Sequence, residues 1–154
     1  MTERHSGKRL FVTAIFILVL DQVTKGLALQ FLNRDTGIPI LAHVFHLTLV
    51  QNQGIAFGIF DTHAHFLLGA ITASVLILVI YPFFSPPEKL RDQVAYGFIL
   101  GGAAGNLVDR VRLGFVVDFL DFRIWPVFNV ADTFITIGVS LLILSTFKKS
   151  SHAS

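Results

Sequence analysis

The sequence predicts an all-α integral membrane protein: four transmembrane helices, with a small outward-facing β-containing segment between the first and the second. Composition is the first observation behind this prediction. Hydrophobic residues make up 53% of the 154 residues and charged residues only 14%, whereas a water-soluble domain carries about 25% charged residues. The second observation is a set of four apolar stretches, each close to the length that crosses a bilayer core; they lie at about 10–31, 66–84, 93–110 and 128–147.

The charge and the cysteine content exclude several function classes. The formal net charge is only +2 and no basic stripe with interleaved aromatic residues is present, so we expect no nucleic-acid partner. The chain has no cysteine, which excludes disulfides, thiolate nucleophiles and cysteine-based zinc sites. A cofactor is not expected either.

The first apolar stretch predicts a helix that is retained in the mature protein. The basic residues Arg4, Lys8 and Arg9 before an apolar run are also typical of a secretory signal peptide, but no small-x-small cleavage site follows them. Asp21 and Lys25 are four residues apart, so they share a helix face and can form an ion pair. We interpret this pair as structural support for two buried polar groups, with a proton relay as the alternative.

The segment 33–65, between the first two apolar stretches, has a different pattern. Within it, Ile38–Val50 is rich in β-branched and bulky apolar residues that loosely alternate with polar ones, which predicts a short strand or hairpin at the membrane surface. Asn52-Gln53-Gly54 is a turn signal. Two histidine pairs suggest a zinc site as an alternative, but they lack an HExxH or cysteine pattern, so we expect no metal; the pairs are His43 with His46 and His63 with His65.

The second and third apolar stretches predict two further spans. The second contains no charged residue and is the clearest spanning helix. The third has glycines at every fourth position, a spacing that lets another helix backbone approach closely; they are Gly97, Gly101 and Gly105. We predict that this ridge packs against a neighbouring span, with dimerisation as the alternative. At the outward end of the same helix, Asn106, Asp109 and Arg110 share one face.

Two carboxylates are expected to meet where the fourth stretch begins. Asp132 lies about one turn inside this stretch, with Asn129 a turn before it on the same face, and Asp118 precedes it at the same surface. Two carboxylates in one site cannot both ionise comfortably, so the pair titrates as a unit. One ionised and one protonated carboxyl can activate a water and polarise a scissile carbonyl, as in aspartic proteases.

A purely structural interpretation of these carboxylates remains open at this stage. Asp132 is favourable near a helix N-terminus as a capping residue. Asp118 can be an ordinary loop residue, and we expect the nearby Asp121 to be one. Against this, the face of Asn106, Asp109 and Arg110 lies at the same surface, and spacing alone leaves the two interpretations about equal.

The distribution of basic residues predicts the orientation of the helices. Four spans place both termini on one side of the membrane, together with the turn that follows the second span. That side carries the larger number of lysine and arginine residues, which favours cytoplasmic termini; they are Arg4, Lys8, Arg9, Lys89, Arg91, Lys148 and Lys149.

Five motifs, taken in order, resemble those of the type II (lipoprotein) signal peptidases of bacteria over nearly the whole chain. Each motif by itself is weakly specific, whereas five in the family's order are a specific signal. They are Asp21-Gln22-Val23-Thr24-Lys25; Asn52-Gln53-Gly54-Ile55-Ala56-Phe57-Gly58; Gly102-Ala103-Ala104-Gly105-Asn106-Leu107-Val108-Asp109-Arg110; Val117-Asp118-Phe119; and Phe128-Asn129-Val130-Ala131-Asp132.

The resemblance implies a single integral-membrane aspartic peptidase domain over 1–154, in the bacterial inner membrane, with its active site near the periplasmic face. It implies diacylglyceryl-modified prolipoproteins as substrates, cut just before the lipidated cysteine, and sensitivity to the cyclic peptide globomycin. We expect a monomer surrounded by membrane lipids. By the family pattern Asp118 and Asp132 are the catalytic pair; the substrate-binding and supporting positions are Asn52, Gly54, Asn106, Asp109, Arg110, Asn129, Ala131, Asp21 and Lys25.

Two other functions compete with a peptidase. A small proton-coupled transporter would use membrane carboxylates as a relay and would carry polar residues through the whole depth of the bundle. A non-catalytic membrane assembly factor would use the glycine ridge and the outward segment to bind partners, and would tolerate the loss of Asp118 or Asp132.

Overall fold

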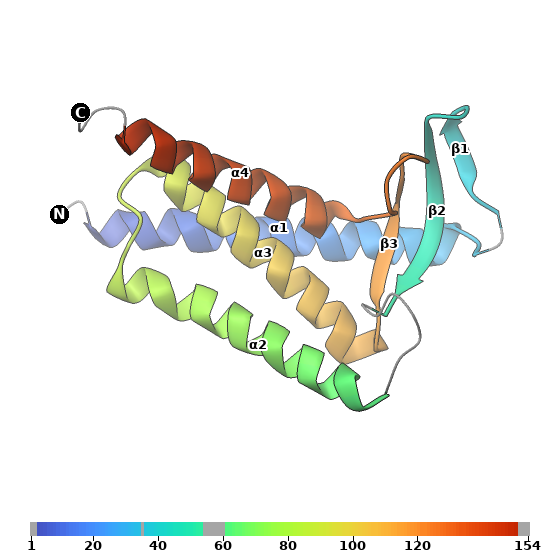
Figure 1. Cartoon of the computed structure of the whole chain (residues 1–154), viewed down its shortest axis with the longest axis horizontal. Coiled ribbons are helices and arrows are strands. Elements are labelled where there is room, and N and C mark those ends of the chain that lie inside the picture. Colours follow the sequence, from blue (N-terminus) through green and yellow to red (C-terminus); the bar gives the residue numbers. More distant parts are fainter. Residues whose placement is uncertain (1–2, 35, 54–60, 151–154) are drawn as a thin grey trace.

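The computed structural model describes residues 3–34, 36–53 and 61–150, and over these ranges the chain forms four helices and a three-stranded sheet (Figure 1). The elements are α1 (Glu3–Phe31), β1 (Ile38–Leu41), β2 (Phe45–Asn52), α2 (Asp61–Phe84), α3 (Leu90–Leu113), β3 (Val116–Asp121) and α4 (Val130–Ser150). The predicted apolar stretches are therefore helical, which confirms the helical class. All four helices extend beyond the apolar residues at one end or both, because hydropathy marks only the apolar part of a helix, and α4 begins at Val130, two residues after the predicted start.

The helices run lengthwise, with both termini at one end of the molecule and the sheet at the other (Figure 1). Among the described residues, Gly7–Phe31 of α1 and Val130–Phe147 of α4 are long and apolar enough to cross a membrane, and α2 contains a shorter apolar stretch, Leu68–Phe84. Large apolar side chains are exposed along these helices, such as Phe16 of α1 and Leu144 of α4. Such surfaces suit a lipid environment, where exposed apolar side chains carry no penalty.

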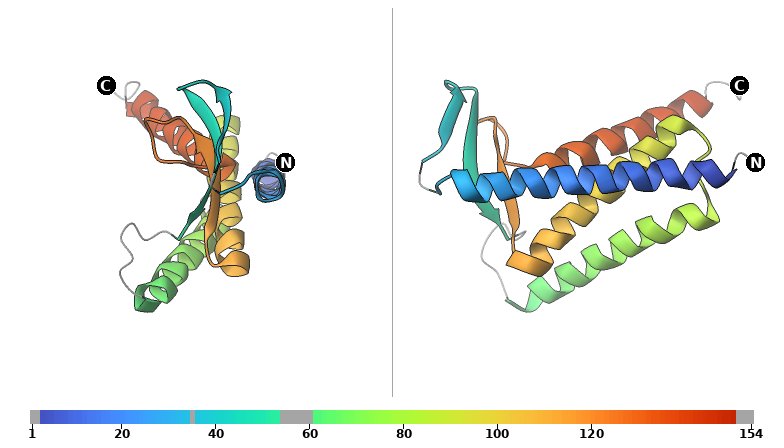
Figure 2. Two further views of the ribbon diagram at one scale, coloured as in Figure 1. Left: turned by 90° about the vertical axis from the view of Figure 1, so that its right-hand side faces the viewer. Right: turned by 180° about the vertical axis from the view of Figure 1, so that it is seen from behind.

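The central helix is α3, which lies between α1 and α4 when the bundle is viewed along its length (Figure 2, left). The predicted glycine ridge causes the close approach to α1. A Cβ at Gly97 would lie 2.6 Å from the Cβ of Thr13, and one at Gly101 would lie 2.5 Å from the carbonyl oxygen of Ala14. The prediction that this ridge packs against a neighbouring helix is confirmed.

The contact between α3 and α4 is equally close and uses glycine from both helices. A Cβ at Gly102 of α3 would lie 2.6 Å from the carbonyl oxygen of Ala131, and one at Gly138 of α4 would lie 2.6 Å from that of Ala95. Helix α2 packs on α3 through larger side chains, including the stacked rings of Tyr81 and Tyr96, whose centroids are 5.7 Å apart. The two glycine contacts fix α1, α3 and α4 as one packed unit.

The sheet has the order β1-β2-β3, and both pairings are antiparallel. The predicted hairpin is confirmed by β1 and β2. Strand β3 was not predicted, because the partner that makes Val116–Asp121 a strand lies far away in the sequence: Val50 pairs with Asp118 and Gln51 with Val117. The interpretation of Asp121 as an ordinary loop residue was wrong, since Asp121 is a buried residue at the end of β3.

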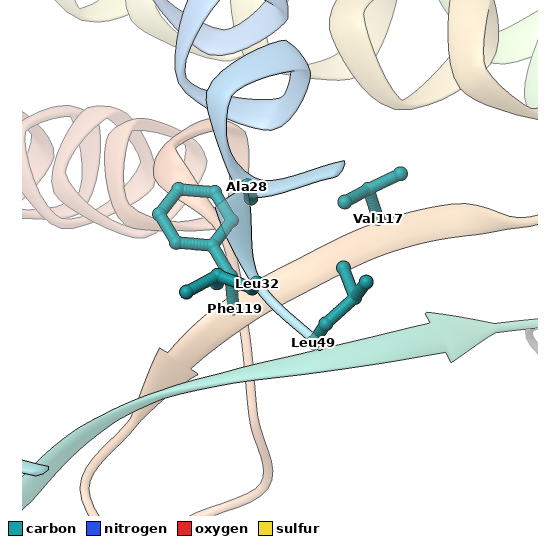
Figure 3. Packing of buried hydrophobic residues seen from close by; sticks show 5 residues of the cluster. All are labelled: Ala28, Leu32, Leu49, Val117 and Phe119. Atoms are coloured by element: carbon teal, nitrogen blue, oxygen red, sulfur yellow. The ribbon is translucent and has the colours of Figure 1, made fainter. Parts of the chain in front are cut away.

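A small hydrophobic cluster attaches the sheet to the end of α1 (Figure 3). Its members come from α1, the residue that follows α1, β2 and β3, and are Ala28, Leu32, Leu49, Val117 and Phe119. Successive side chains of a strand point to opposite faces. Because Val117 and Phe119 face this cluster, Asp118 between them faces the other way.

We predict that Gly101→Ala destabilises the protein by about 1–3 kcal/mol, since the added methyl group cannot fit against the backbone of α1 without displacing it. The measurement is the unfolding midpoint in detergent micelles. The matched control is Gly26→Ala on α1, where an added Cβ would meet nothing within 4 Å; there the higher helix propensity of alanine is expected to leave stability unchanged or slightly raised. Equal effects of the two substitutions would contradict the packing role of the ridge.

Candidate active site

A fully buried lysine lies at the centre of the polar residues near the sheet. The Nζ atom of Lys25 is 2.9 Å from Oδ2 of Asp21 and 3.0 Å from Oδ2 of Asp109, and it donates a hydrogen bond of 2.8 Å to Oδ1 of Asn106. Lys25, Asp21 and Asp109 are each buried. The predicted Asp21–Lys25 pair is confirmed, and the structure adds Asp109 and Asn106 from α3, so that three acceptors replace the water that this ammonium group loses.

The two carboxylates that bind Lys25 also hold the backbone of β3 and α4. The amide N–H of Ala131 donates to Oδ1 of Asp21 over 2.9 Å, and the amide N–H of Val117 donates to Oδ2 of Asp109 over 3.0 Å. Ala131 immediately precedes Asp132, and Val117 immediately precedes Asp118. The buried ion cluster therefore positions the residue next to each of the two carboxylates that the sequence singled out.

Gln22 is a further member of this network that was quoted among the motif residues but not proposed for the site. Its Nε2 donates to Oδ1 of Asp109 over 2.9 Å and is also 3.2 Å from the carbonyl oxygen of Gly105. The signal that was available is its position next to Asp21 within the otherwise largely apolar stretch 10–31 of the helix. Gln22 satisfies the second oxygen of Asp109, which a lone ion pair would leave unbound.

Asn129 caps α4 and contacts three other polar residues. Its Oδ1 accepts the backbone N–H of Asp132 over 2.9 Å, which is the bond an N-cap residue makes to the third helical position. Its Nδ2 is 2.6 Å from Oδ1 of Asp118 and 3.2 Å from Oδ1 of Asn106. The capping role considered for Asp132 is thus filled by Asn129, which leaves the carboxyl of Asp132 for other contacts.

Asp118 and Asp132 are connected through uncharged amides. Asp118 is 1% exposed and accepts hydrogen bonds from Nδ2 of Asn52 (2.9 Å) and from Nδ2 of Asn129. Asp132 is half-buried, and its Oδ1 accepts a 2.8 Å bond from Nδ2 of Asn106. Burial raises the pKa of Asp118 and the charge of Asp132 raises it further, while the two amide bonds oppose both effects. The surroundings of Asp118 thus favour its protonated form.

The remaining predicted residues surround this pair, with one exception. Arg110 is within electrostatic range of Asp118 and Asp132, and its Nη1 donates to the carbonyl oxygen of Asn106 over 3.2 Å. Ala131 is fully buried, and its carbonyl oxygen lies against Gly102 of α3. Gly54 lies outside the described residues, so its predicted role stays a prediction.

Within the described ranges, no three histidine or acidic side chains are grouped as a metal site requires. His43 lies in the turn between β1 and β2, and His46 lies on β2. The side chains of His63 and His65 are outside the described part of the chain.

Comparison with known proteins places the chain among bacterial membrane enzymes. Residues 13–148 match the model of the family described as signal peptidase (SPase) II. The chain is 42% identical to a lipoprotein signal peptidase of Halothermothrix orenii, over 87% of this chain and 92% of that protein, and 47% identical to one of Caldanaerobacter subterraneus, over 85% and 90%. A solved bacterial membrane enzyme has the same fold, with a TM-score of 0.83 and 32% identity over 94% of this chain and 91% of that one.

We predict that Lys25→Met destabilises the protein by about 3–5 kcal/mol, because it leaves Asp21 and Asp109 buried without a counter-charge. Unfolding midpoints in detergent measure the effect. The triple variant Asp21→Asn, Lys25→Met and Asp109→Asn removes all three charges and is expected to recover most of the loss. A single Lys25→Met variant as stable as the parent would show that the cluster does not hold the fold together.

Proposed function

The chain belongs to the signal peptidase II family of membrane aspartic peptidases, which remove signal peptides from lipoproteins, and we propose that Asp118 and Asp132 are the catalytic carboxyls of this reaction. The observation that carries the proposal is the amide bridge between them: Asn129 bonds Asp118 through Nδ2 and the backbone N–H of Asp132 through Oδ1. A structural carboxylate would be expected to pair with a cation, whereas these two are joined by neutral groups.

The proposed mechanism assigns one proton to the pair. Asp118, whose pKa is raised mainly by burial, holds that proton. Asp132 removes a proton from a water molecule as its oxygen attacks the scissile carbonyl carbon, and Asp118 donates a hydrogen bond to the carbonyl oxygen on which negative charge develops. The tetrahedral intermediate then collapses: the C–N bond breaks and the departing amine nitrogen takes a proton from the pair.

The neighbouring residues have positioning roles in this mechanism. Asn52 and Asn129 orient the carboxyl of Asp118, and Asn106 orients that of Asp132. Arg110 lies close enough to bind a peptide carbonyl or a lipid ester oxygen of the substrate. None of the described hydrogen bonds to Asp118 or Asp132 comes from a charged group.

The proposed substrate is a prolipoprotein already modified with a diacylglyceryl group, cut just before the lipidated cysteine. Its acyl chains would lie along the apolar helix surfaces while the peptide reaches the carboxyls beside the sheet. The competing transporter would need polar groups through the whole bundle, but the described buried polar side chains lie near the sheet, apart from Gln93 at the start of α3. This distribution supports the peptidase.

We also propose the membrane arrangement that the sequence predicts. All four helices span the inner membrane of a bacterium, both termini are cytoplasmic, and the sheet and Asp118 lie at the periplasmic face. The shared end of the two termini and the opposite position of the sheet support this arrangement (Figure 1). The enzyme is proposed to act as a monomer comprising one domain and to be inhibited by globomycin.

We predict that Asp118→Asn and Asp132→Asn each reduce cleavage by about 10²-fold or more, because neither amide can replace a carboxyl in proton transfer. The measurement is kcat/KM for a diacylglyceryl-modified prolipoprotein peptide in lipid vesicles. Asp92→Asn, at the opposite end of α3, is the matched control and should cleave at the parent rate. If either active-site variant keeps the parent rate, the catalytic assignment is wrong.

We predict that Asn52→Ala moves the alkaline limb of the pH–rate profile to higher pH. The bond from Asn52 favours the ionised form of Asp118 and lowers its pKa, so its removal lets Asp118 keep the catalytic proton at higher pH. The profile of kcat/KM against pH measures the shift. Gln53→Ala, an exposed neighbouring position, is the control and should leave the limb in place. A limb that moves to lower pH would contradict Asp118 as the holder of the proton.

A further inference from the structure

The loop that leads from Asp121, the last residue of β3, toward α4 covers residues 121–128 and presents two large apolar side chains outward. Two backbone hydrogen bonds between Leu120 and Phe128, of 2.8 and 3.1 Å, close the loop at its base. At its tip Ile124 is 94% exposed and Trp125 is 69% exposed. Ile124 has the largest exposed fraction of any large apolar side chain in the described ranges. In water, this arrangement would be unfavourable.

Specific contacts hold the loop in this shape. Oδ1 of Asp121 accepts the backbone N–H of Arg123 over 2.8 Å, and its Oδ2 accepts bonds from Nη1 of Arg123 (3.0 Å) and Oγ1 of Thr48 (2.9 Å). These bonds, the backbone N–H of Arg123 foremost, lower the pKa of Asp121 and keep it ionised. Arg123 has a φ of 65°, a left-handed conformation that a non-glycine residue adopts only when its surroundings impose it.

Aromatic packing fixes the loop to the sheet as well. The ring of Phe122 stacks on Phe128 at 5.9 Å and lies 4.8 Å from Phe45 at the start of β2. Beside Phe45, the turn between β1 and β2 exposes Val44. The apolar tip is thus part of a wider apolar edge of the sheet. The backbone N–H of Ile124 donates to the carbonyl oxygen of Phe122 over 2.7 Å, whereas the ring contacts and ion pair described above do not use the side chains of Ile124 or Trp125.

The position of the loop indicates its partner. It rises beside the sheet and returns to Val130, where the apolar helix α4 begins (Figure 1). Tryptophan is enriched at this level of membrane proteins, where a helix leaves the hydrocarbon and enters the headgroup region. The half-exposed Arg123 adjoins the tip and can extend to lipid phosphates, as basic side chains do at such boundaries.

We propose that the 121–128 loop is a membrane-interface anchor, in which Ile124 and Trp125 insert into the periplasmic leaflet and Arg123 binds lipid phosphate. The loop joins the strand of Asp118 to the helix of Asp132, so its depth in the leaflet sets the height of both carboxyls relative to the lipid surface. The anchor rests on the proposed topology but not on the proposed chemistry.

Trp125 is the single tryptophan of the chain, so its fluorescence reports on the loop alone. The protein in phospholipid vesicles is titrated with lipids that carry a quencher in the headgroup, near the top of the acyl chain or near its end. We expect strong quenching by the first two, weak quenching by the third, and little by acrylamide in the water. Strong acrylamide quenching without lipid quenching would overturn the proposal.

A substrate peptide is the other partner that could cover the tip, and the same signal distinguishes it. In the Asp118→Asn variant, which is expected to bind substrate without cutting it, the lipid quenching should be present before any peptide is added. Shielding of Trp125 that appears only with peptide would overturn the anchor. The variant Trp125→Phe with Val139→Trp places the probe midway along α4 and calibrates the deep position.

The effect on catalysis is tested by the double variant Ile124→Ser and Trp125→Ser. We expect its kcat/KM to fall in vesicles but to stay near the parent value in detergent micelles, because only the bilayer has a fixed surface from which depth is set. Phe147→Ser, an exposed position at the other end of α4, is the matched control and should be silent in both. Equal losses of kcat/KM in vesicles and micelles would refute the anchor. The activity of the Asp118→Asn variant tests the proposed chemistry alone and does not bear on the anchor.

Discussion

The buried ammonium group of Lys25 is the interaction on which the site depends. It lies between carboxylates of two helices, and each carboxylate uses its remaining capacity to hold a backbone N–H: that of Ala131 for Asp21 and that of Val117 for Asp109. A buried ion cluster is costly to assemble and more costly to break. The cluster therefore holds Ala131 of α4 and Val117 of β3 against α1 and α3. The loop between β3 and α4 could not by itself hold these residues as rigidly.

Neutral amides then separate this charged cluster from the two proposed catalytic carboxyls. Asn106 bonds both Lys25 and Asp132, and Asn129 bonds both Asp118 and the backbone of Asp132. A cation in either position would favour ionisation of both carboxyls, and a third carboxylate would oppose it. An amide fixes geometry without adding charge. Asp118 and Asp132 can therefore share one proton although only Asn106 lies between Lys25 and Asp132.

Close helix packing makes room for this arrangement. In lipid, helices gain little from burying apolar surface, and small residues that allow backbone contact take over that role. Gly101 and Gly102 of α3 bring α1 and α4 against opposite sides of the same helix, and at Gly105 a side chain would occupy the place of the Asp21 carboxylate. The glycines therefore form the helix contacts and also leave space for the ion cluster.

Local sequence patterns determined much of this protein by themselves. The four helices, the hairpin, the Asp21–Lys25 pair and the glycine ridge follow from hydropathy and from spacings within one or two turns, because those interactions join near neighbours. The motif order gave the family and the positions of both carboxyls. Only the tertiary structure decided that Val116–Asp121 pairs with β2, that Asp109 shares Lys25, and that Asp121 shapes a loop. The strand pairing, the shared lysine and the bond from Thr48 to Asp121 join residues far apart along the chain, where no periodic signal exists, so only the packed fold selects the partner.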